Sequence, residues 1–272
     1  RVLSNIVCSD VNEAYTLCIS ECGGVYSMGE SKEGAHGQET KVVSPRLIES
    51  LKNIHSISCG NGHSVCLDVQ GNVFTFGSNY YGQLGICKGR ETVPHSHIPQ
   101  KVNLPPIKQI SSGCYFILCL STTGFVYSFG KNDFGQLGTG KNTKYYNVPQ
   151  KIKSLKNIDF IECGGFFSIC KNDDGDIFCW GRNNNGELGL GSIIFSKKPI
   201  KCTSWPDDVV DIKCSNYHTL VLTSNQEVYT CGSNIFGLLG RQIEEKVCPN
   251  LKKLANLSNI VRIECGRCHS MC

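Results

Sequence analysis

A five-residue phrase recurs along this chain at an almost constant interval, and this period constrains the fold more than any other feature of the sequence. The phrase consists of an aliphatic residue, an aromatic residue, a small or polar residue, a variable residue and a closing glycine. Its copies end at Gly29, Gly77, Gly130, Gly181 and Gly232, which are 48, 53, 51 and 51 residues apart. Such a period indicates an architecture in which one supersecondary unit is repeated side by side.

Three further markers recur with the same period. A Cys-Gly-x-x-His element precedes the phrase, as in residues 59–63, and a glycine box such as residues 135–138 follows it. A proline comes late in each unit, at Pro45, Pro99, Pro149, Pro199 and Pro249. Because proline has no N–H for a strand ladder, it is confined to edge strands and strand starts. The last strand of each unit is therefore expected at the outer edge of a sheet.

Each unit contains three short apolar runs of strand length and a fourth run marked by the proline, without a sustained helical period. Turns rich in Gly, Asn and Asp separate these runs. The pattern predicts an all-β chain, a single β-propeller over residues 1–272 with four-stranded antiparallel blades. The expected repeats cover residues 1–58, 59–111, 112–162, 163–213 and 214–264, with the start of another at 265–272.

The ordered boxes resemble the repeats of the regulator of chromosome condensation family over essentially the whole chain. That family combines a Cys-Gly-x-x-His element, a Val-Tyr-x-Trp-Gly element and an Asn-x-x-Gly-x-Leu-Gly element, and residues 126–138 and 177–189 are the most similar to it. The resemblance implies a seven-bladed ring of four-stranded blades. Since 272 residues supply little more than five such repeats, we expect a piece of a longer propeller, with a complete smaller ring as the alternative.

Cysteine is unusually frequent, with 18 residues, and more than half of these occupy or lie near two repeated positions. One position holds Cys18, Cys66, Cys119, Cys170 and Cys272; the other holds Cys59, Cys163, Cys214 and Cys265, with Cys8 nearby. Val221 and Ser112 replace cysteine at these positions, which neither a disulfide nor a metal site would tolerate. We expect free thiols that pack as small apolar residues, in a cytoplasmic or nuclear protein. A disulfide framework and a metal site are the alternatives.

The sequence shows no catalytic constellation, so whether the chain is an enzyme stays open. Residues 265–269 match the short pattern for covalent haem attachment, but the repeat already accounts for three of these five residues. His63 and His218 share a repeat position with Phe116 and Phe167, so the position functions without an imidazole. The glycine boxes lie between strands, whereas a phosphate-binding loop opens into a helix. We expect no cofactor, no metal and no small-molecule substrate.

The formal charge of +4 is too small to indicate nucleic-acid binding by itself. Lysines gather near the prolines, within residues 151–156, 197–201 and 252–253. Lysine on an edge strand is typical of protection against edge-to-edge pairing, and a contact with chromatin or an acidic partner is the alternative. No uninterrupted apolar stretch approaches the length of a membrane span, so no membrane contact is expected.

A propeller without a catalytic motif is expected to bind other proteins through its loops. The resemblance implies two more specific functions: guanine-nucleotide exchange on a Ran-like small GTPase, or partner recognition within a larger ubiquitin ligase. The exchange factor of the family carries a wedge-like insertion. The longest turn between a glycine box and a proline here, Ile86 to Ile98, exceeds the others by only a few residues, which argues against exchange activity.

Partner contacts are expected at the turn after each Cys-Gly element, because these turns differ between repeats while the strands recur. Aromatic and Arg side chains are the usual anchors of protein interfaces. The candidate residues are Asn61, Tyr115, Phe116, Phe166, Tyr217 and Arg267 in these turns, with His95 and His97 in the longer Ile86–Ile98 loop. Corresponding turns are expected on one face of the propeller. For Phe116 and Phe166, the alternative is that the rings fold inward.

Overall fold

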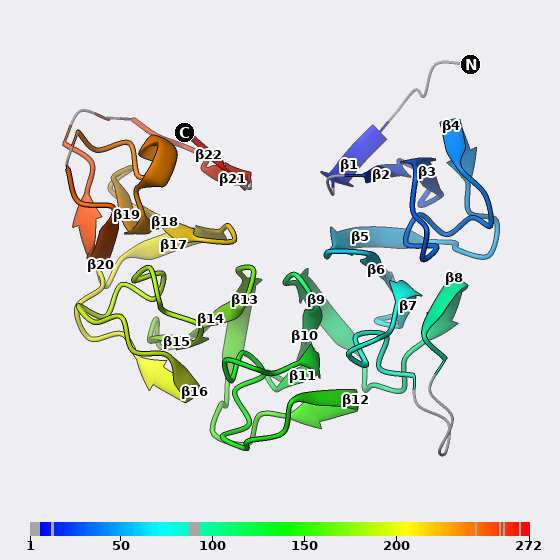
Figure 1. Cartoon of the computed structure of the whole chain (residues 1–272), viewed down its shortest axis with the longest axis horizontal. Helices are drawn as coiled ribbons and strands as arrows, with labels where there is room; N and C mark the ends of the chain where they lie inside the picture. Colours follow the sequence, from blue (N-terminus) through cyan, green and yellow to red (C-terminus); the bar gives the residue numbers. More distant parts are fainter. Residues whose placement is uncertain are drawn as a thin grey trace. The chain divides into compact units, whose positions relative to one another are not determined.

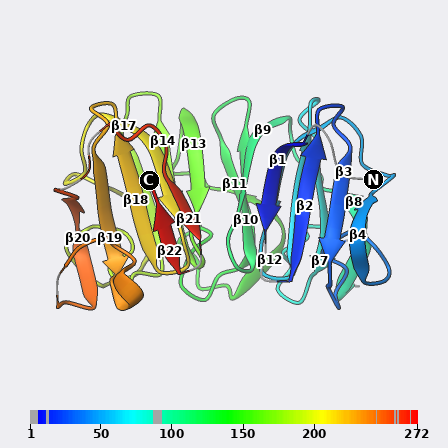
Figure 2. The same ribbon diagram turned by 90° about the horizontal axis from the view of Figure 1, so that it is seen from above.

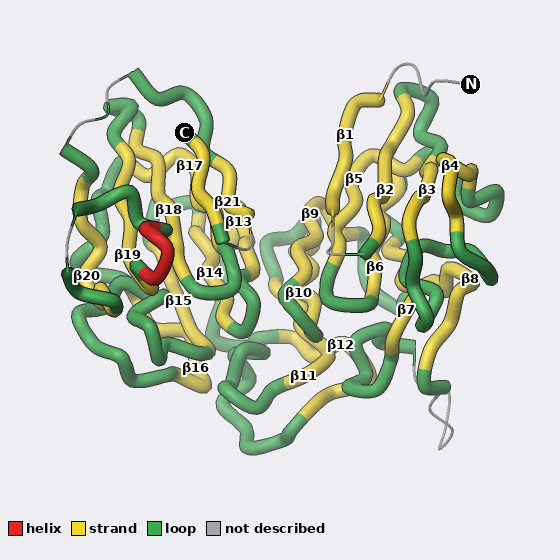
Figure 3. Tube along the Cα trace, turned by 45° about the horizontal axis from the view of Figure 1, so that its top comes forward, coloured by secondary structure: helices red, strands yellow, loops and turns green. Residues whose placement is uncertain are grey.

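The computed structural model describes residues 6–11, 14–86, 93–242, 244–255, 257, 259–266 and 268–272. β-Strands form its regular structure, together with the short 3-10 helix η1 (Ile235–Gly237), which is red in Figure 3. The chain forms two compact units. The first consists of Arg1–Asn132 and Thr143–Ile152, and the second consists of Asp133–Asn142 and Lys153–Cys272.

The strands of the first unit form three four-stranded antiparallel sheets, which we call blades 1 to 3 (Figure 1). Blade 1 contains β1 (Ile6–Val11), β2 (Tyr15–Ser20), β3 (Val25–Gly29) and β4 (Val42–Leu47). Blade 2 contains β5 (Ile54–Cys59), β6 (His63–Asp68), β7 (Val73–Ser78) and β8 (His95–Lys101). Blade 3 contains β9 (Ile107–Ser112), β10 (Phe116–Ser121), β11 (Val126–Lys131) and β12 (Tyr145–Lys151).

The second unit contains blades 4 and 5 and a two-stranded sheet. Blade 4 contains β13 (Ile158–Cys163), β14 (Phe167–Asn172), β15 (Ile177–Gly181) and β16 (Ser196–Lys201). Blade 5 contains β17 (Val209–Cys214), β18 (His218–Thr223), β19 (Val228–Ser233) and β20 (Val247–Lys253). The two-stranded sheet pairs β21 (Glu264–Gly266) with β22 (His269–Met271).

Neighbouring strands in every blade are consecutive in sequence, so the fourth strand lies at an edge; Figure 2 shows this order for blade 1. The five repeated prolines lie in β4, β8, β12, β16 and β20, the fourth strands of the five blades. The predictions of four-stranded antiparallel blades and of a proline-marked edge strand are therefore confirmed. A missing N–H is tolerated there because an edge strand has a ladder on one side only.

The blades begin earlier than the expected repeats. The expected boundaries at 59, 112, 163 and 214 fall on the last residues of β5, β9, β13 and β17, and so separate each first strand from its own sheet. The Cys-Gly element marks the end of a strand because its glycine opens the turn to the next one. In blade 2, for example, the N–H of Gly60 donates to the carbonyl of His63 at 2.8 Å.

The closing glycine of each phrase is required by the backbone, as Gly130 shows. Its φ is +103°, and a Cβ atom at this position would lie 2.5 Å from the carbonyl oxygen of Tyr115 and 2.7 Å from the Cα of Phe116. Both atoms belong to the main chain, so a side chain would displace the turn itself. The recurrence of glycine here therefore has a steric cause.

The cysteines of the first repeated position are largely core residues. Cys66, Cys119 and Cys170 are completely buried in the second strands of their blades, and burial raises the pKa of each thiol. No disulfide bond joins two of the cysteines that the structure describes; Cys87 lies outside the described residues. Within this part of the chain, no group of three His, Cys, Asp or Glu side chains is placed to hold a metal ion. Nor do the described residues include a helix of a length and hydrophobicity that would cross a membrane.

Candidate interaction surface at the strand turns

Two kinds of connection emerge at the same end of each blade, because its strands are antiparallel. One is the tight turn between the first and second strands, and the other is the long loop between the third and fourth strands. Asn61, Tyr115, Phe166 and Tyr217 lie in the tight turns of blades 2, 3, 4 and 5. The structure places these four residues in two clusters, one in each unit.

The Tyr115 cluster, in the first unit, consists of Asn61, Tyr81, Tyr115 and Lys131. The side-chain amide of Asn61 donates to the Tyr115 hydroxyl at 2.7 Å. The rings of Tyr81 and Tyr115 meet edge to face, with centroids 5.3 Å apart and an interplanar angle of 63°. The Lys131 ammonium lies 4.4 Å from the Tyr81 centroid and 5.4 Å from that of Tyr115. Burial is the main reason that the pKa of Tyr115 is raised, so its hydroxyl is neutral at physiological pH.

The Arg182 cluster, in the second unit, consists of Phe134, Phe166, Arg182, Glu187 and Tyr217. The rings of Phe134 and Phe166 also meet edge to face, at 5.7 Å and 67°. The Arg182 guanidinium lies 5.1 Å from the centroids of both Phe166 and Tyr217. Its Nε donates to the completely buried carboxylate of Glu187 at 3.0 Å, and the guanidinium also donates to the main-chain carbonyl of Asn216.

The two clusters are built on the same repeat positions. Lys131 and Arg182 each follow the closing glycine of a phrase, and Tyr81 and Phe134 each lie four residues after one. These four residues were missed in the sequence analysis, which considered only the turns after the Cys-Gly elements and the loop from Ile86 to Ile98. Aligning the residues after the closing glycines would have revealed the recurring cation and aromatic ring. In both clusters, a cation lies against aromatic faces and holds the rings in place. Each such cation–π contact stabilises the arrangement by about 0.5–2 kcal/mol.

For Phe116, the sequence left a surface position and an inward position both open. It is the first residue of β10 and is completely buried, so the inward alternative holds for this residue. Phe166 remains half-buried within the Arg182 cluster. His95 and His97 were expected in a loop but lie in the edge strand β8, where the ladder pairs His95 with Ser78. Arg267 lies outside the described residues.

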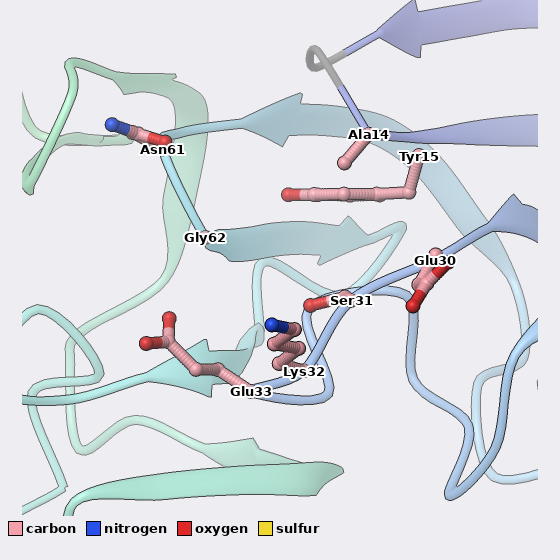
Figure 4. A pocket seen from close by; sticks show the side chains of 8 residues that line it. All are labelled: Ala14, Tyr15, Glu30, Ser31, Lys32, Glu33, Asn61 and Gly62. Carbon is pink, nitrogen blue, oxygen red and sulfur yellow. The ribbon is translucent and has the colours of Figure 1, made fainter.

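Blade 1 and blade 2 carry small residues where the other turns carry aromatic rings. Ala14 and Gly62 occupy the position of Tyr115, and a hollow of about 540 Å³ opens beside them (Figure 4). Charged side chains also line this hollow, which is bounded by Ala14, Tyr15, Glu30, Ser31, Lys32, Glu33, Asn61 and Gly62. Glu30 is paired with Lys41 at 3.1 Å. The hollow therefore presents a rim of mixed charge.

Two of the repeated histidines, His63 and His218, are completely buried. Burial lowers the pKa of His63 to about 3, and neither ring nitrogen has a hydrogen-bond partner among the described residues. The ring nitrogens of His218 lie 2.6 Å from Ser215 Oγ and 2.7 Å from Ser270 Oγ, and burial is the main reason that its pKa is lowered to about 4. Both rings are neutral at physiological pH, as expected for side chains that pack or bond near a turn.

Comparison with known proteins supports the same architecture. A family model described as the RCC1-like domain matches residues 2–272. Human E3 ubiquitin-protein ligase HERC2 is 30% identical over 267 residues, 94% of this chain, and the human probable E3 ubiquitin-protein ligase HERC6 is 34% identical over 274 residues, 95% of this chain. The chain spans 6% of the length of the first relative and 26% of the second.

A solved structure supports the fold alone. Prp20p from Saccharomyces cerevisiae, which was examined for binding to Gsp1p and histones, matches with a TM-score of 0.81 and 22% identity. The match covers 97% of this chain and 68% of that chain. Together with the five four-stranded blades, this likeness confirms the predicted β-propeller fold.

Proposed function

Because the chain belongs to the family of RCC1-like domains, we propose that it is a non-catalytic protein-interaction domain that binds its partner through the Tyr115 and Arg182 clusters. One observation carries this proposal. Half-buried aromatic rings lie against cations that are held in place, in turns that the fold can also form without aromatic rings. Aromatic and Arg side chains dominate binding energy when they are held in place before binding, since little conformational entropy is then lost.

Blades 1 and 2 supply the internal comparison. Their turns carry Ala14 and Gly62 at the position of Tyr115, and both blades still form four-stranded sheets. The scaffold therefore does not need an aromatic ring at this position. A contribution to recognition explains the rings of Tyr115, Phe166 and Tyr217 better than a contribution to the strands.

The finer proposal is partner recognition within a larger ubiquitin ligase, in the cytoplasm or the nucleus. HERC2 and HERC6 support it, since both resemble this chain over more than nine-tenths of its length and are themselves several times longer. That no disulfide bond joins two of the described cysteines supports a reducing compartment. A ligase domain encoded in the same transcript would favour this proposal, and a complete transcript without one would count against it.

Guanine-nucleotide exchange on a Ran-like small GTPase is the second candidate function. Its support is the fold shared with Prp20p, which was examined for binding to Gsp1p. Release of a fluorescent GDP analogue from a Ran-like GTPase separates the two candidates. Release accelerated by the chain would favour exchange, whereas stable capture of a partner with unchanged release would favour recognition.

The proposed surface is tested by affinity capture with a Tyr115→Ala/Tyr217→Ala variant. We expect the wild-type chain to retain a specific partner and the double variant to lose it. Tyr145→Ala is the matched control, because Tyr145 is an exposed tyrosine of the edge strand β12, outside both clusters. Equal capture by the wild type and a correctly folded double variant would reject the surface.

A further inference from the structure

Blade 4 presents three consecutive apolar side chains to solvent. Ile193, Ile194 and Phe195 lie in the loop between β15 and β16 (Figure 1), and their exposed fractions are 54%, 74% and 42%. Single exposed apolar residues are common on protein surfaces, but a contiguous group marks an interaction site or an aggregation hazard. The question is whether the fold itself needs apolar residues in this loop.

Blade 3 shows that it does not. The same positions of its loop, counted from the glycine box, hold Asn142, Thr143 and Lys144. An equivalent asparagine bonds to the loop backbone in both blades. Asn132 Nδ2 donates to the carbonyl of Thr143 at 2.8 Å, and Asn183 Nδ2 donates to the carbonyl of Ile194 at 3.1 Å. A polar sequence therefore builds the equivalent loop, and the Ile-Ile-Phe run is not a folding requirement.

The loop of blade 4 is also held at several points along its backbone. Asn183 is completely buried, and its Nδ2 makes a second bond, to the carbonyl of Ser192 at 2.8 Å. The N–H of Gly191 donates to the carbonyl of Pro249 in β20 at 2.8 Å. The apolar side chains are consequently presented on a fixed backbone, which lowers the entropy lost on binding.

Positive charge borders the apolar run. Lys197 and Lys198 are the second and third residues of the edge strand β16. No carboxylate of the described residues forms an ion pair with either lysine. The Lys197 ammonium bonds to Asn142 Oδ1 at 2.6 Å and lies 5.7 Å from the Phe195 ring centroid. A ligand that covers the apolar run would therefore meet two cations at its border, so its complementary charge is negative.

We propose that the blade 4 patch, formed by Ile193, Ile194, Phe195, Lys197 and Lys198, binds a short segment of another protein in which apolar side chains stand beside acidic ones. Three apolar side chains and two lysines offer far less area than the roughly 800 Å² per partner of a standard interface between folded proteins. A short segment fits this size. The proposal is independent of the proposed function, because the patch contains no residue of the Tyr115 or Arg182 cluster.

The test measures fluorescence anisotropy of short labelled peptides in which Glu alternates with Leu or Phe. We expect the chain to bind these peptides, to bind Lys-for-Glu versions at least about tenfold more weakly, and to bind Ser-for-apolar versions equally poorly. Added salt should weaken the binding, because the lysines contribute by charge. Failure of the wild-type chain to bind the acidic–apolar peptides would overturn the proposal, as would equal binding of the Lys versions.

The blade 3 sequence provides the decisive variant, Ile193→Asn/Ile194→Thr/Phe195→Lys. It adds a positive charge, so a purely electrostatic contact would become stronger, whereas we expect binding to fall by about tenfold or more. Lys197→Gln/Lys198→Gln is the second variant and should remove the salt dependence even if the first folds poorly. Unchanged binding in either variant would overturn the proposal. So would recruitment of the wild type to phosphatidylserine vesicles without peptide binding, which would assign the patch to a membrane surface.

Discussion

The hydroxyl of Tyr15 donates to the main-chain carbonyl of His63 at 2.8 Å and so joins blade 1 to blade 2. Tyr15 is buried, and burial is the main reason that the pKa of its hydroxyl is raised well above its usual value. Ser64 Oγ lies 2.9 Å from the same hydroxyl. His218 makes the corresponding contact in the second unit, where its Nε2 lies 2.7 Å from Ser270 Oγ. Tyr15 and His218 thus each make a polar contact with the following sheet from this repeat position, whereas the ring nitrogens of His63 have no hydrogen-bond partner among the described residues.

Replacing Tyr15 with Phe should destabilise the protein by about 1–2 kcal/mol, because the carbonyl of His63 then loses a buried hydrogen bond while packing is kept. Urea denaturation measures the change in the free energy of unfolding. Tyr145→Phe serves as the control, since Tyr145 is exposed and its change should lie within about 0.5 kcal/mol of zero. A Tyr15→Phe chain as stable as the wild type would contradict a stabilising hydrogen bond between Tyr15 and the carbonyl of His63.

His63 should make stability depend on pH. Its pKa falls from the usual 6.5 to about 3 on folding, so the unfolded chain binds more protons between these values. The contribution of neutral His63 is complete above pH 6.5 and is lost as the pH falls, by about 2 kcal/mol at pH 5. His63→Phe, the residue found at this position in blades 3 and 4, should flatten the profile of unfolding free energy between pH 7.5 and 5. If the profile of the His63→Phe chain were as steep as that of the wild type, His63 would not be the source of the pH dependence.

Gly130→Ala should cost about 2 kcal/mol or more, because the added Cβ would meet main-chain atoms at 2.5 and 2.7 Å and φ is +103°. Gly237→Ala is the matched control. Its φ of +71° is also unfavourable for alanine, but nothing lies within 4 Å of the added Cβ. Chemical denaturation should rank the Gly130 variant as the less stable of the two, and the reverse order would argue against the close approach.

Arg182→Ala should destabilise the second unit by about 3 kcal/mol, because it removes the cation from the buried carboxylate of Glu187. Glutamine occupies the position of Glu187 in blades 2 and 3, at Gln83 and Gln136. Adding Glu187→Gln to the Arg182→Ala chain should therefore restore part of the loss. Thermal or urea unfolding measures both variants, and a double variant no more stable than the single one would contradict the pairing.

Among the described cysteines, Cys22 should be the fastest to react with iodoacetamide at neutral pH. It is exposed, and its hydrogen bond with Ser20 Oγ is the main reason that its pKa is lowered, whereas burial raises the pKa of Cys272. Mass spectrometry of partly alkylated protein gives the order of reaction. Ser20→Ala should slow the reaction of Cys22, and native Cys66 and Cys119 should remain unmodified. Early modification of either buried thiol would contradict their place in the core.

Phe116 and Tyr115 show what the sequence left open about the surface. Both are aromatic and adjacent, and the turn pattern does not say which one begins the strand. In the structure Phe116 begins β10 and turns inward, so its neighbour Tyr115 is left in the turn. His95 and His97 were placed in a loop for a similar reason. An edge strand can begin without alternating apolar residues, so the sequence does not show where β8 starts.

The sequence alone determined the repeated blade, its all-β character, the edge position of the prolines and the burial of Cys66, Cys119 and Cys170. These features are local: they depend on alternating apolar residues, on the missing N–H of proline and on glycine at positive φ, all readable within one period. Only the tertiary structure decided that Tyr81 meets Tyr115 and that Lys131 lies against both rings. Tyr81 and Tyr115 belong to different blades, so their contact depends on how two sheets pack, which no pattern within one repeat encodes.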